Sequence, residues 1–381
     1  MRILMVSIFS SHFFNWVKQL ENSGHQIYWL DVYDSNTYIE KISFVEQIIG
    51  WRYKWDFKGR NYLKKNHKKL YQRISKFNER DLEHFFEKKV KEIKPDVVHS
   101  FSMQNACYPI KNVMLKYSKI RWIYSAWGSD MYYYNRMGAF LEAQKVLGQI
   151  DFMFSDCERD YRIANENSFN GIYLGKFPGR GGYDVKKYSL YLKSFSDRNV
   201  ILIKGYQGKH GRCIEVLNSL LLIKSELSNF KIIVFGASED VVDFVDKSDI
   251  KINLDLEVFG KISHDKVMEL MGATKVYIGN SQSDGIPNSL LEAIVMNAYP
   301  IQSNPGGATE ELIKDKVNGR IINDPLDTEQ IALVIKEVIN YSSLEWAISY
   351  NSKNIKPELE RKFVEKKVLE AYTKVEKLIF Q

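Results

Sequence analysis

Short apolar runs alternate with amphipathic segments along the whole chain. After the first run, an amphipathic segment at 13–22 followed by Gly24 predicts a helix and its end. The runs predicted as strands are 2–8, 26–30, 97–99, 121–125 and 152–155 in the first half, and 200–203, 231–235, 256–259, 276–278 and 299–302 in the second. This alternation predicts parallel sheets covered on both faces, hence two doubly wound α/β domains.

A polar stretch at 186–198 separates the two halves. We therefore expect an N-terminal domain over 1–190 and a C-terminal domain over 198–360. The helical periodicity of the last residues, 361–381, predicts a closing helix. A chain of 381 residues, 45% of them hydrophobic, is long enough to bury two cores.

The composition narrows the class of protein. No apolar window reaches the roughly 18 residues of a membrane-spanning helix, and the apolar N-terminal run is too short for a secretory signal. Three cysteines, Cys107, Cys157 and Cys213, are odd in number and lack metal-ligand spacing. These features predict a globular protein of the reducing cytoplasm without a disulfide framework.

Two carboxylates eight positions apart, Asp284 and Glu292, bracket a turn and the start of an apolar helix predicted at 288–296. Pro287 suits the first turn of that helix because its fixed φ and missing N–H are tolerated there. A strand is predicted just before, so the amides and positive dipole end of the helix lie beyond its carboxyl edge, where a diphosphate is stabilised. Glu292, one turn inside, is placed to accept hydrogen bonds from ribose hydroxyls. An ordinary Asp-Gly turn at a helix start is the alternative.

A glycine-rich turn with three cations follows the strand at 200–203. Its cations Lys204, Lys209 and Arg212 suit a pyrophosphate, because the backbone can approach closely and the side chains offer positive charge. We select Lys204 and Arg212, the latter because the first helical turn would aim it inward. A solvated charged loop is the alternative interpretation.

The pair Lys204 and Arg212 bears on whether the reaction needs a metal ion. A leaving nucleoside diphosphate needs either a metal ion or fixed cations and a helix dipole. The chain has no Asp-x-Asp motif at a strand end and no His/Cys cluster with ligand spacing. We therefore expect no metal and no cofactor.

The stretch around Asp284 and Glu292 resembles the E-x7-E signature of the retaining family 4 glycosyltransferases (glycosyl transferases group 1). The openings at 1–6 and 20–25 and the run Lys-Pro-Asp-Val-Val-His-Ser at 94–100 are similar to other recurring segments of that family. The resemblance implies the GT-B fold, two facing Rossmann-like domains with an interdomain cleft. It also implies that the final helix crosses back to the N-terminal domain.

The resemblance further implies roles for the site residues. Asp284, one methylene shorter than the family's usual Glu, is expected beside the donor sugar and Glu292 at the ribose. Transfer is expected to retain anomeric configuration, with the acceptor hydroxyl attacking on the leaving-group face and no enzymic nucleophile. The other residues expected to contact the donor are Gly285, Ile286, Pro287, Asn288, Ser289 and Leu290.

Fewer sequence patterns indicate which residues would contact the acceptor. Ser11 and His12 follow the first strand, where His12 is either a contact to acceptor or phosphate or an ordinary capping residue. The loop with Trp127, Gly128 and Asp130 resembles the family's "HGsD" loop, with Trp127 in place of the usual histidine. Trp cannot shuttle a proton, but its ring can stack on a sugar. Asp130 is then the polar catalytic candidate, or else a capping residue.

The segment 51–73 carries nine Lys or Arg and the single acid Asp56, interleaved with aromatic residues that begin at Trp51. Basic and aromatic side chains together suit an anionic membrane surface and hence a lipid-linked saccharide acceptor. A solvated helix face is the alternative. The net charge of +7 is modest and no nucleic-acid recognition motif is present, so we expect no nucleic-acid partner.

The sequence thus predicts a hexosyltransferase-type glycosyltransferase that uses a UDP- or GDP-sugar. We expect it to act on the inner face of the cell membrane, peripherally, in the synthesis of a bacterial surface polysaccharide such as lipopolysaccharide or capsule. Two alternatives remain: a sugar-nucleotide epimerase of similar fold, and a catalytically silent sugar-nucleotide-binding module.

Overall fold

The computed structural model describes residues 1–55, 57–208, 210–341 and 344–381. Asp56 and Lys209, which entered the expectations above, lie outside these residues. The chain divides into two compact units. Unit 1 consists of Met1–Ser155, Tyr161–Arg180 and Lys367–Gln381, and unit 2 of Asp156–Asp160 and Gly181–Lys366.

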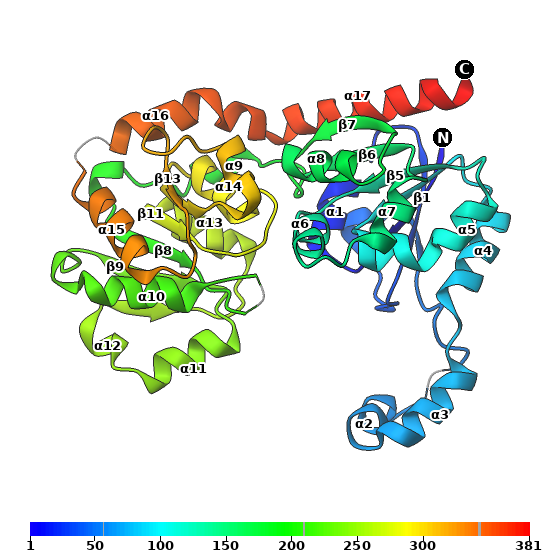
Figure 1. Ribbon diagram of the computed structural model, residues 1–381, viewed down its shortest axis with the longest axis horizontal. Coiled ribbons are helices and arrows are strands. Elements are labelled where there is room, and N and C mark those ends of the chain that lie inside the picture. Colours follow the sequence, from blue (N-terminus) through cyan, green and yellow to red (C-terminus); the bar gives the residue numbers. More distant parts are fainter. Residues whose placement is uncertain (56, 209, 342–343) are drawn as a thin grey trace. The chain divides into compact units, whose positions relative to one another are not determined.

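Unit 1 is built on a parallel sheet of seven strands in the order β3-β2-β1-β4-β5-β6-β7 (Figure 1). Its strands are β1 (Arg2–Ser7), β2 (Gln26–Asp31), β3 (Glu46–Ile48), β4 (Val97–Phe101), β5 (Arg121–Ser125), β6 (Phe152–Ser155) and β7 (Ile172–Lys176). The strand order reverses between β1 and β4. In open α/β sheets such a reversal marks the carboxyl edge where ligands bind.

Apart from the two helices within residues 60–78, the helices of unit 1 pack their apolar faces on this sheet, around large buried side chains such as Trp29 and Trp122. They are α1 (Ser11–Lys18), α2 (Arg60–Asn66), α3 (Lys68–Asn78), α4 (Leu82–Ile93), α5 (Lys111–Lys116), α6 (Ser129–Arg136), α7 (Leu141–Leu147) and most of α8 (Glu158–Glu166) and α17 (Arg361–Phe380). Helix α1 begins where it does because the Ser10 hydroxyl accepts a hydrogen bond from the Phe13 amide at 3.2 Å.

Helix α17 is held to unit 1 by a buried polar network. The Tyr372 hydroxyl lies 2.7 Å from Nδ1 of His99, and the other ring nitrogen of His99 lies 2.8 Å from the Ser125 hydroxyl. Trp16 donates its indole N–H to the same Tyr372 oxygen at 3.3 Å. Burial lowers the pKa of His99 well below its usual value and raises the pKa of Tyr372. The network is therefore neutral.

Unit 2 repeats the architecture with six parallel strands in the order β10-β9-β8-β11-β12-β13. Its strands are β8 (Val200–Lys204), β9 (Lys231–Phe235), β10 (Leu256–Val258), β11 (Thr274–Gly279), β12 (Tyr299–Ser303) and β13 (Arg320–Ile322). Its helices are α9 (Val185–Ser189), α10 (Cys213–Leu222), α11 (Glu239–Lys247), α12 (Ile250–Asn253), α13 (His264–Gly272), α14 (Asn288–Val295), α15 (Thr328–Ile339) and α16 (Leu344–Asn354). Here the order reverses between β8 and β11.

The predicted α/β class and all ten predicted strands are confirmed. The sequence did not predict β3, β7 and β13, because each is an edge strand with one paired neighbour and a short or polar run of residues. Edge strands lack the continuous apolar signal of strands buried on both faces.

The basic and aromatic segment folds into α2 and α3, which stand off from the sheet of unit 1 in Figure 1. Trp51 does not share this surface, which corrects the expectation for that residue. Its side chain is buried, its indole N–H donates to the Asp31 carbonyl at 2.8 Å, and its ring stacks on Phe85. Trp51 therefore belongs to the core of unit 1.

Candidate functional site

At the carboxyl edge of the unit 2 sheet, the structure brings together two of the predicted donor residues. Lys204 is the last residue of β8, and Asp284 lies in the loop between β11 and α14. Because β8 and β11 are neighbours, their ends meet, and the Lys204 ammonium lies 3.3 Å from Oδ2 of Asp284. The side chains remain 20% and 30% exposed, so the pair is open to a ligand.

Lys204 is positively charged at neutral pH. Burial lowers its pKa, but Asp284 and the nearby Tyr277 and Tyr206 outweigh that effect and raise it to about 12. The ammonium also lies 5.0 Å from the centre of the Tyr206 ring. Lys204 is therefore a fixed cation beside a carboxylate at the strand end.

The N-terminus of α14 adds a second source of positive potential. Its N-cap residue is Pro287, and no side chain in the described part of the chain caps the helix. The Gly285 amide donates to Oδ1 of Asp284 at 3.1 Å, which holds the carboxylate at this end of the helix. The arrangement suits an anionic ligand by charge and by hydrogen bonding.

Not every predicted donor residue turns its side chain toward this edge. Leu290 is fully buried in the core, and the Ser289 hydroxyl accepts a hydrogen bond from Tyr277 at 2.7 Å. Ile286 and Asn288 are half-buried, and Tyr183 donates to the carbonyl oxygen of Asn288 at 3.1 Å. For Ser289 and Leu290, the backbone is the part that can face a ligand.

Glu292 is 3% exposed and has a partner that the sequence did not indicate. Nε2 of His264, the first residue of α13, lies 2.8 Å from Oε1 of Glu292. The Tyr188 hydroxyl lies 3.3 Å from the other ring nitrogen of His264. No local pattern marks His264 or Tyr188, because both act through residues far away in the sequence.

Arg212 has a different place from the one expected. It is the N-cap residue of α10 rather than part of its first turn, which corrects that expectation. Its guanidinium donates to the carbonyls of Gly208 and Gly211 and to the Gln282 side chain. Arg212 thus ties the glycine-rich loop to the loop that follows β11.

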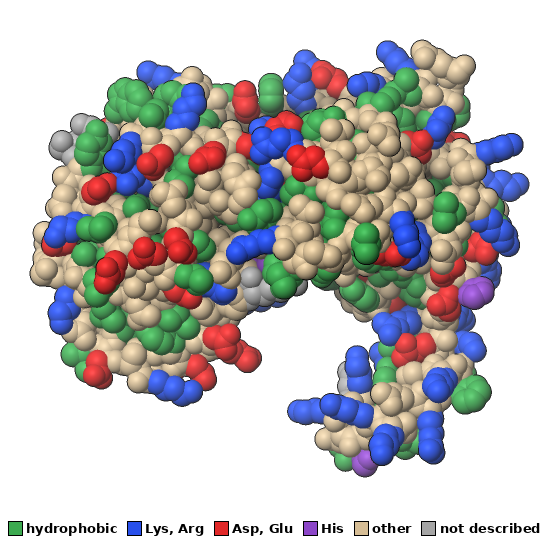
Figure 2. Space-filling model, in the orientation of Figure 1, with side chains coloured by type: hydrophobic (Ala, Val, Ile, Leu, Met, Phe, Trp, Pro, Cys, Tyr) green, Lys and Arg blue, Asp and Glu red, His purple; other side chains and the backbone are tan. Residues whose placement is uncertain are grey.

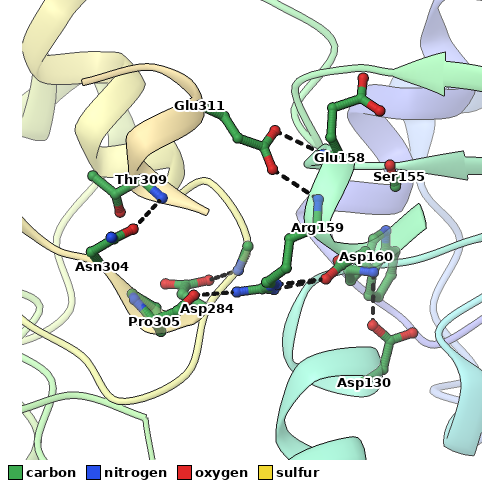
Figure 3. A network of polar contacts seen from close by, with 12 residues as sticks. Asp130, Ser155, Glu158, Arg159, Asp160, Asp284, Asn304, Pro305, Thr309 and Glu311 are labelled. Carbon is green, nitrogen blue, oxygen red and sulfur yellow. Dashed lines mark hydrogen bonds and ion pairs between the residues drawn. The ribbon is translucent and has the colours of Figure 1, made fainter. Parts of the chain in front are cut away.

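A further network joins residues 156–160 to the turn after β12 (Figure 3). Glu311 accepts hydrogen bonds from the amides of Glu158 and Arg159 at 2.7 and 2.8 Å, so it caps the start of α8. Arg159, itself buried, donates to Asp160 at 2.7 and 3.0 Å and to the Pro305 carbonyl at 2.6 Å. The Pro-Gly-Gly turn is therefore fixed from within unit 2.

In unit 1, the predicted acceptor residues lie after β1 and β5. Ser11 is exposed at the start of α1, and the half-buried His12 ring lies 5.9 Å from the Trp127 ring, with 42° between their planes. Gly128 has φ +81°, a conformation that favours glycine. The structure thus places His12 and Trp127 side by side.

Asp130 faces the interior. Its carboxylate accepts hydrogen bonds from the Trp127 amide, the Met103 amide and the Tyr124 hydroxyl, at 2.8, 2.8 and 2.7 Å. Burial raises its pKa, and the hydrogen bonds oppose that shift. Of the two roles considered for Asp130, this geometry fits the structural one, in which it joins the loops after β4 and β5.

Two features are absent from residues 1–55, 57–208, 210–341 and 344–381. Nowhere in those ranges do three His, Cys, Asp or Glu side chains gather in a way that could hold a metal ion. None of the helices described has the length and apolar character needed to cross a membrane.

The sequence matches two family descriptions. Residues 188–355 match glycosyl transferases group 1, and residues 2–154 match glycosyl transferase 4-like. The two matches together account for most of the chain. A search of curated proteins gave no match.

Solved structures share the fold at low sequence identity. Sucrose-phosphate synthase from Thermosynechococcus elongatus is 13% identical, with a TM-score of 0.71 over 98% of this chain and 99% of that one. A glycosyltransferase from Rickettsia africae is 14% identical, with a TM-score of 0.65 over 98% of each chain. Anabaena HepE, solved in complex with UDP, is 10% identical, with a TM-score of 0.68 over 98% of this chain and 100% of that one.

These likenesses confirm the predicted GT-B class for a chain with two parallel sheets covered by helices. Both family matches describe glycosyl transferases, and they fall on the two halves of the chain. The chain is therefore a glycosyltransferase and belongs to the glycosyl transferases group 1 family.

Proposed function

We propose that this glycosyltransferase takes a sugar from a UDP-sugar and transfers it, with retention and without a metal ion, to a lipid-linked saccharide. The reaction belongs to bacterial surface polysaccharide synthesis, such as lipopolysaccharide or capsule, at the inner face of the cell membrane. Support for the nucleotide comes from Anabaena HepE, a structural neighbour that was solved with UDP and with UDP-glucose.

The observation that carries the donor assignment is the edge of unit 2 where Lys204, Asp284 and the start of α14 meet. As the glycosidic bond breaks, negative charge grows on the leaving diphosphate. The Lys204 ammonium and the α14 dipole supply positive potential there, so the charge can be stabilised without a metal ion. In this mechanism Asp284 lies by the donor sugar.

Retention follows from a front-face substitution. The acceptor hydroxyl bonds to the anomeric carbon on the face from which the diphosphate leaves, and the departing phosphate oxygen takes the hydroxyl proton. One C–O bond forms as another breaks, and no enzyme nucleophile takes part. The buried, internally bonded Asp130 fits this scheme, because the scheme needs no enzymic base from that residue.

The donor proposal is tested by slow hydrolysis of UDP-, GDP-, ADP- and dTDP-sugars in the presence of EDTA, without acceptor. We expect release of UDP alone and of a sugar with the donor's anomeric configuration. Release of another nucleotide would replace UDP in the proposal, and loss of activity with EDTA would overturn metal independence. Sugar interconversion without release would indicate an epimerase, and nucleotide binding without any turnover a silent module.

The acceptor proposal rests on the α2–α3 arm, which we define as residues 60–78. This arm has seven Lys or Arg and no Asp or Glu. Tyr62, Leu70 and Phe77 are 62%, 49% and 72% exposed on it. Lys and Arg side chains cover the same segment in Figure 2. Each cation near an anionic bilayer contributes about 1 kcal/mol, and exposed apolar groups insert at the interface.

The arm is held in place by contacts between the residues where the chain enters and leaves it. Arg52, which precedes the arm, and Glu79, which follows it, form an ion pair at 2.8 Å. The Asn78 side chain bonds the backbone of Trp55 at 2.9 and 3.0 Å, and the Arg80 guanidinium bonds the Trp51 carbonyl. These contacts hold the base of the arm, while six of its seven cations are exposed, as a membrane-docking element requires.

Vesicle flotation tests this docking. A variant with Lys64, Lys65, Lys68 and Lys69 changed to Gln should lose binding to vesicles rich in phosphatidylglycerol and keep donor hydrolysis. The matched control changes Lys362, Lys366, Lys374 and Lys377 of α17, which are also exposed, and should bind like wild type. Equal losses in both variants, or an arm that prefers RNA to vesicles, would overturn the membrane assignment.

A further inference from the structure

The donor edge of unit 2 contains a row of three hydrogen-bonded side chains that the proposed mechanism does not use. It runs from the Tyr188 hydroxyl to the His264 ring and on to the Glu292 carboxylate, through contacts of 3.3 and 2.8 Å. Its three members come from α9, α13 and α14. We propose that His264 is a positioning residue that holds Glu292 in the orientation that reads the ribose hydroxyls of the nucleotide.

The burial of Glu292 is the first reason. A carboxylate that is 3% exposed loses most of its hydration, and a buried charge is stable only when it is paired or hydrogen-bonded. The Nε2–H of His264 donates to Oε1 of Glu292 and so gives the buried carboxylate a hydrogen-bond partner. The same bond fixes the rotation of the carboxylate.

The second reason is that Tyr188 fixes the tautomer of the His264 imidazole. When the Tyr188 hydroxyl donates to Nδ1, a neutral His264 must carry its proton on Nε2, where it faces Glu292. The Tyr188 ring also packs edge-on against the His264 ring, with centroids 5.7 Å apart and 84° between the planes. Tyr188 is buried, while the His264 side chain is 27% exposed.

Glu292 keeps the capacity to bind a ligand while His264 holds it. A carboxylate has about four lone-pair directions, so the bond from His264 does not by itself exhaust its capacity to accept hydrogen bonds. As an acceptor without a proton, it selects hydroxyl donors, and a vicinal diol supplies two. The chemistry recognised is therefore the 2′,3′-diol of ribose, which rests on the nucleotide-sugar donor proposed above.

Calorimetric titration with UDP and with 2′,3′-dideoxy-UDP tests this role. Wild type should bind UDP more tightly than the dideoxy analogue. His264→Ala should weaken UDP binding about tenfold, because a hydrogen bond to a charged group is lost, and should leave affinity for the analogue within twofold. His264→Gln can still donate an N–H toward Glu292 and should restore most of the preference for the diol.

Asp265→Asn is the matched control. Asp265 follows His264 on α13 and forms an exposed ion pair with Lys187 of α9 at 2.7 Å. This variant loosens the same two helices without touching Glu292, so its preference for UDP over the analogue should equal that of wild type. Turnover with saturating UDP-sugar should also survive in His264→Ala, which shows its effect in KM and not in kcat.

The outcomes separate the two proposals. If wild type binds UDP and discriminates against the analogue, but His264→Ala discriminates equally well, the positioning role is wrong and the donor site stands. Equal weakening of both ligands in His264→Ala would likewise assign the residue to folding alone. If wild type binds neither ligand, the UDP donor proposal fails and the role of His264 fails with it.

Discussion

The carboxyl edges of the two sheets have the same topology and use their polar groups in opposite ways. In unit 1, Asp130 and His99 are buried and bonded to neighbouring elements, so they hold the fold together. In unit 2, Lys204 and Asp284 pair at the surface with part of each side chain exposed. Burial and partners therefore separate Asp130 and His99, which hold the fold, from the accessible pair Lys204 and Asp284.

The largest expected effect comes from Lys204→Ala. Removing the fixed cation at the leaving diphosphate should lower kcat at saturating donor roughly 10²–10³-fold. Because the ion pair is partly exposed, the free energy of unfolding should change by less than about 1 kcal/mol. Lys231→Ala, which breaks the exposed Lys231–Glu257 pair of the same unit, is the control and should leave kcat unchanged. A kcat for Lys204→Ala within threefold of wild type would contradict the assignment.

Asp130→Ala should show the reverse pattern. Its buried carboxylate accepts three hydrogen bonds, so its loss should lower the free energy of unfolding by about 3 kcal/mol in urea titrations. Affinity for UDP should stay at the wild-type value, because the donor residues lie in unit 2. Asp81→Ala removes an exposed helix cap and should lose only about 1 kcal/mol. A stable Asp130→Ala protein with weakened UDP binding would reverse the comparison.

The buried His99 predicts a pH dependence of stability. Its pKa is lowered in the folded state, so the unfolded chain takes up the proton first as the pH falls. Stability is therefore complete above the unfolded pKa of about 6.5 and is lost as the pH drops below it. His99→Gln should flatten this slope in unfolding measurements between about pH 7 and 5. His25, whose pKa burial also lowers, adds to the slope in both proteins. An unchanged slope in His99→Gln would mean that another group causes it.

Tyr372→Phe should have the smallest effect. It removes the hydroxyl that bonds His99 and Trp16, and keeps the ring, so unfolding should become about 1–2 kcal/mol easier. Donor hydrolysis at a temperature where the protein is folded should not change. Phe363→Leu, an exposed aromatic change on the same helix, serves as the reference. A loss of turnover without a loss of stability would give Tyr372 a role outside the fold.

The sequence predicted what local pattern can encode. Apolar runs indicated the central strands, and the spacing of Asp284 and Glu292 indicated a donor loop at a helix start, where the structure places both residues. The partners of these groups had no such signal. His264 is 28 positions from Glu292, and Tyr372 is 273 positions from His99, so only the folded chain brings them together.

The local sequence pattern also could not predict which polar and aromatic side chains are buried. Asp130 and Trp51 carry groups typical of a site or a surface, yet both are in the interior. The local sequence alone allows a tryptophan in a basic run, or an aspartate in a glycine loop, to be either exposed or buried. Packing against Phe85 or against the loop after β4 decides between them, and that packing depends on residues outside the local window.

Helix α17 also affects how the chain folds during synthesis. Unit 1 is discontinuous, since Lys367–Gln381 completes it only after all of unit 2 has been translated. Until then, a nascent chain holds His99 and Trp16 without the tyrosine hydroxyl that joins them, and the apolar side chains beneath the missing helix remain uncovered. On the ribosome, the first unit to be made is thus the last to be finished.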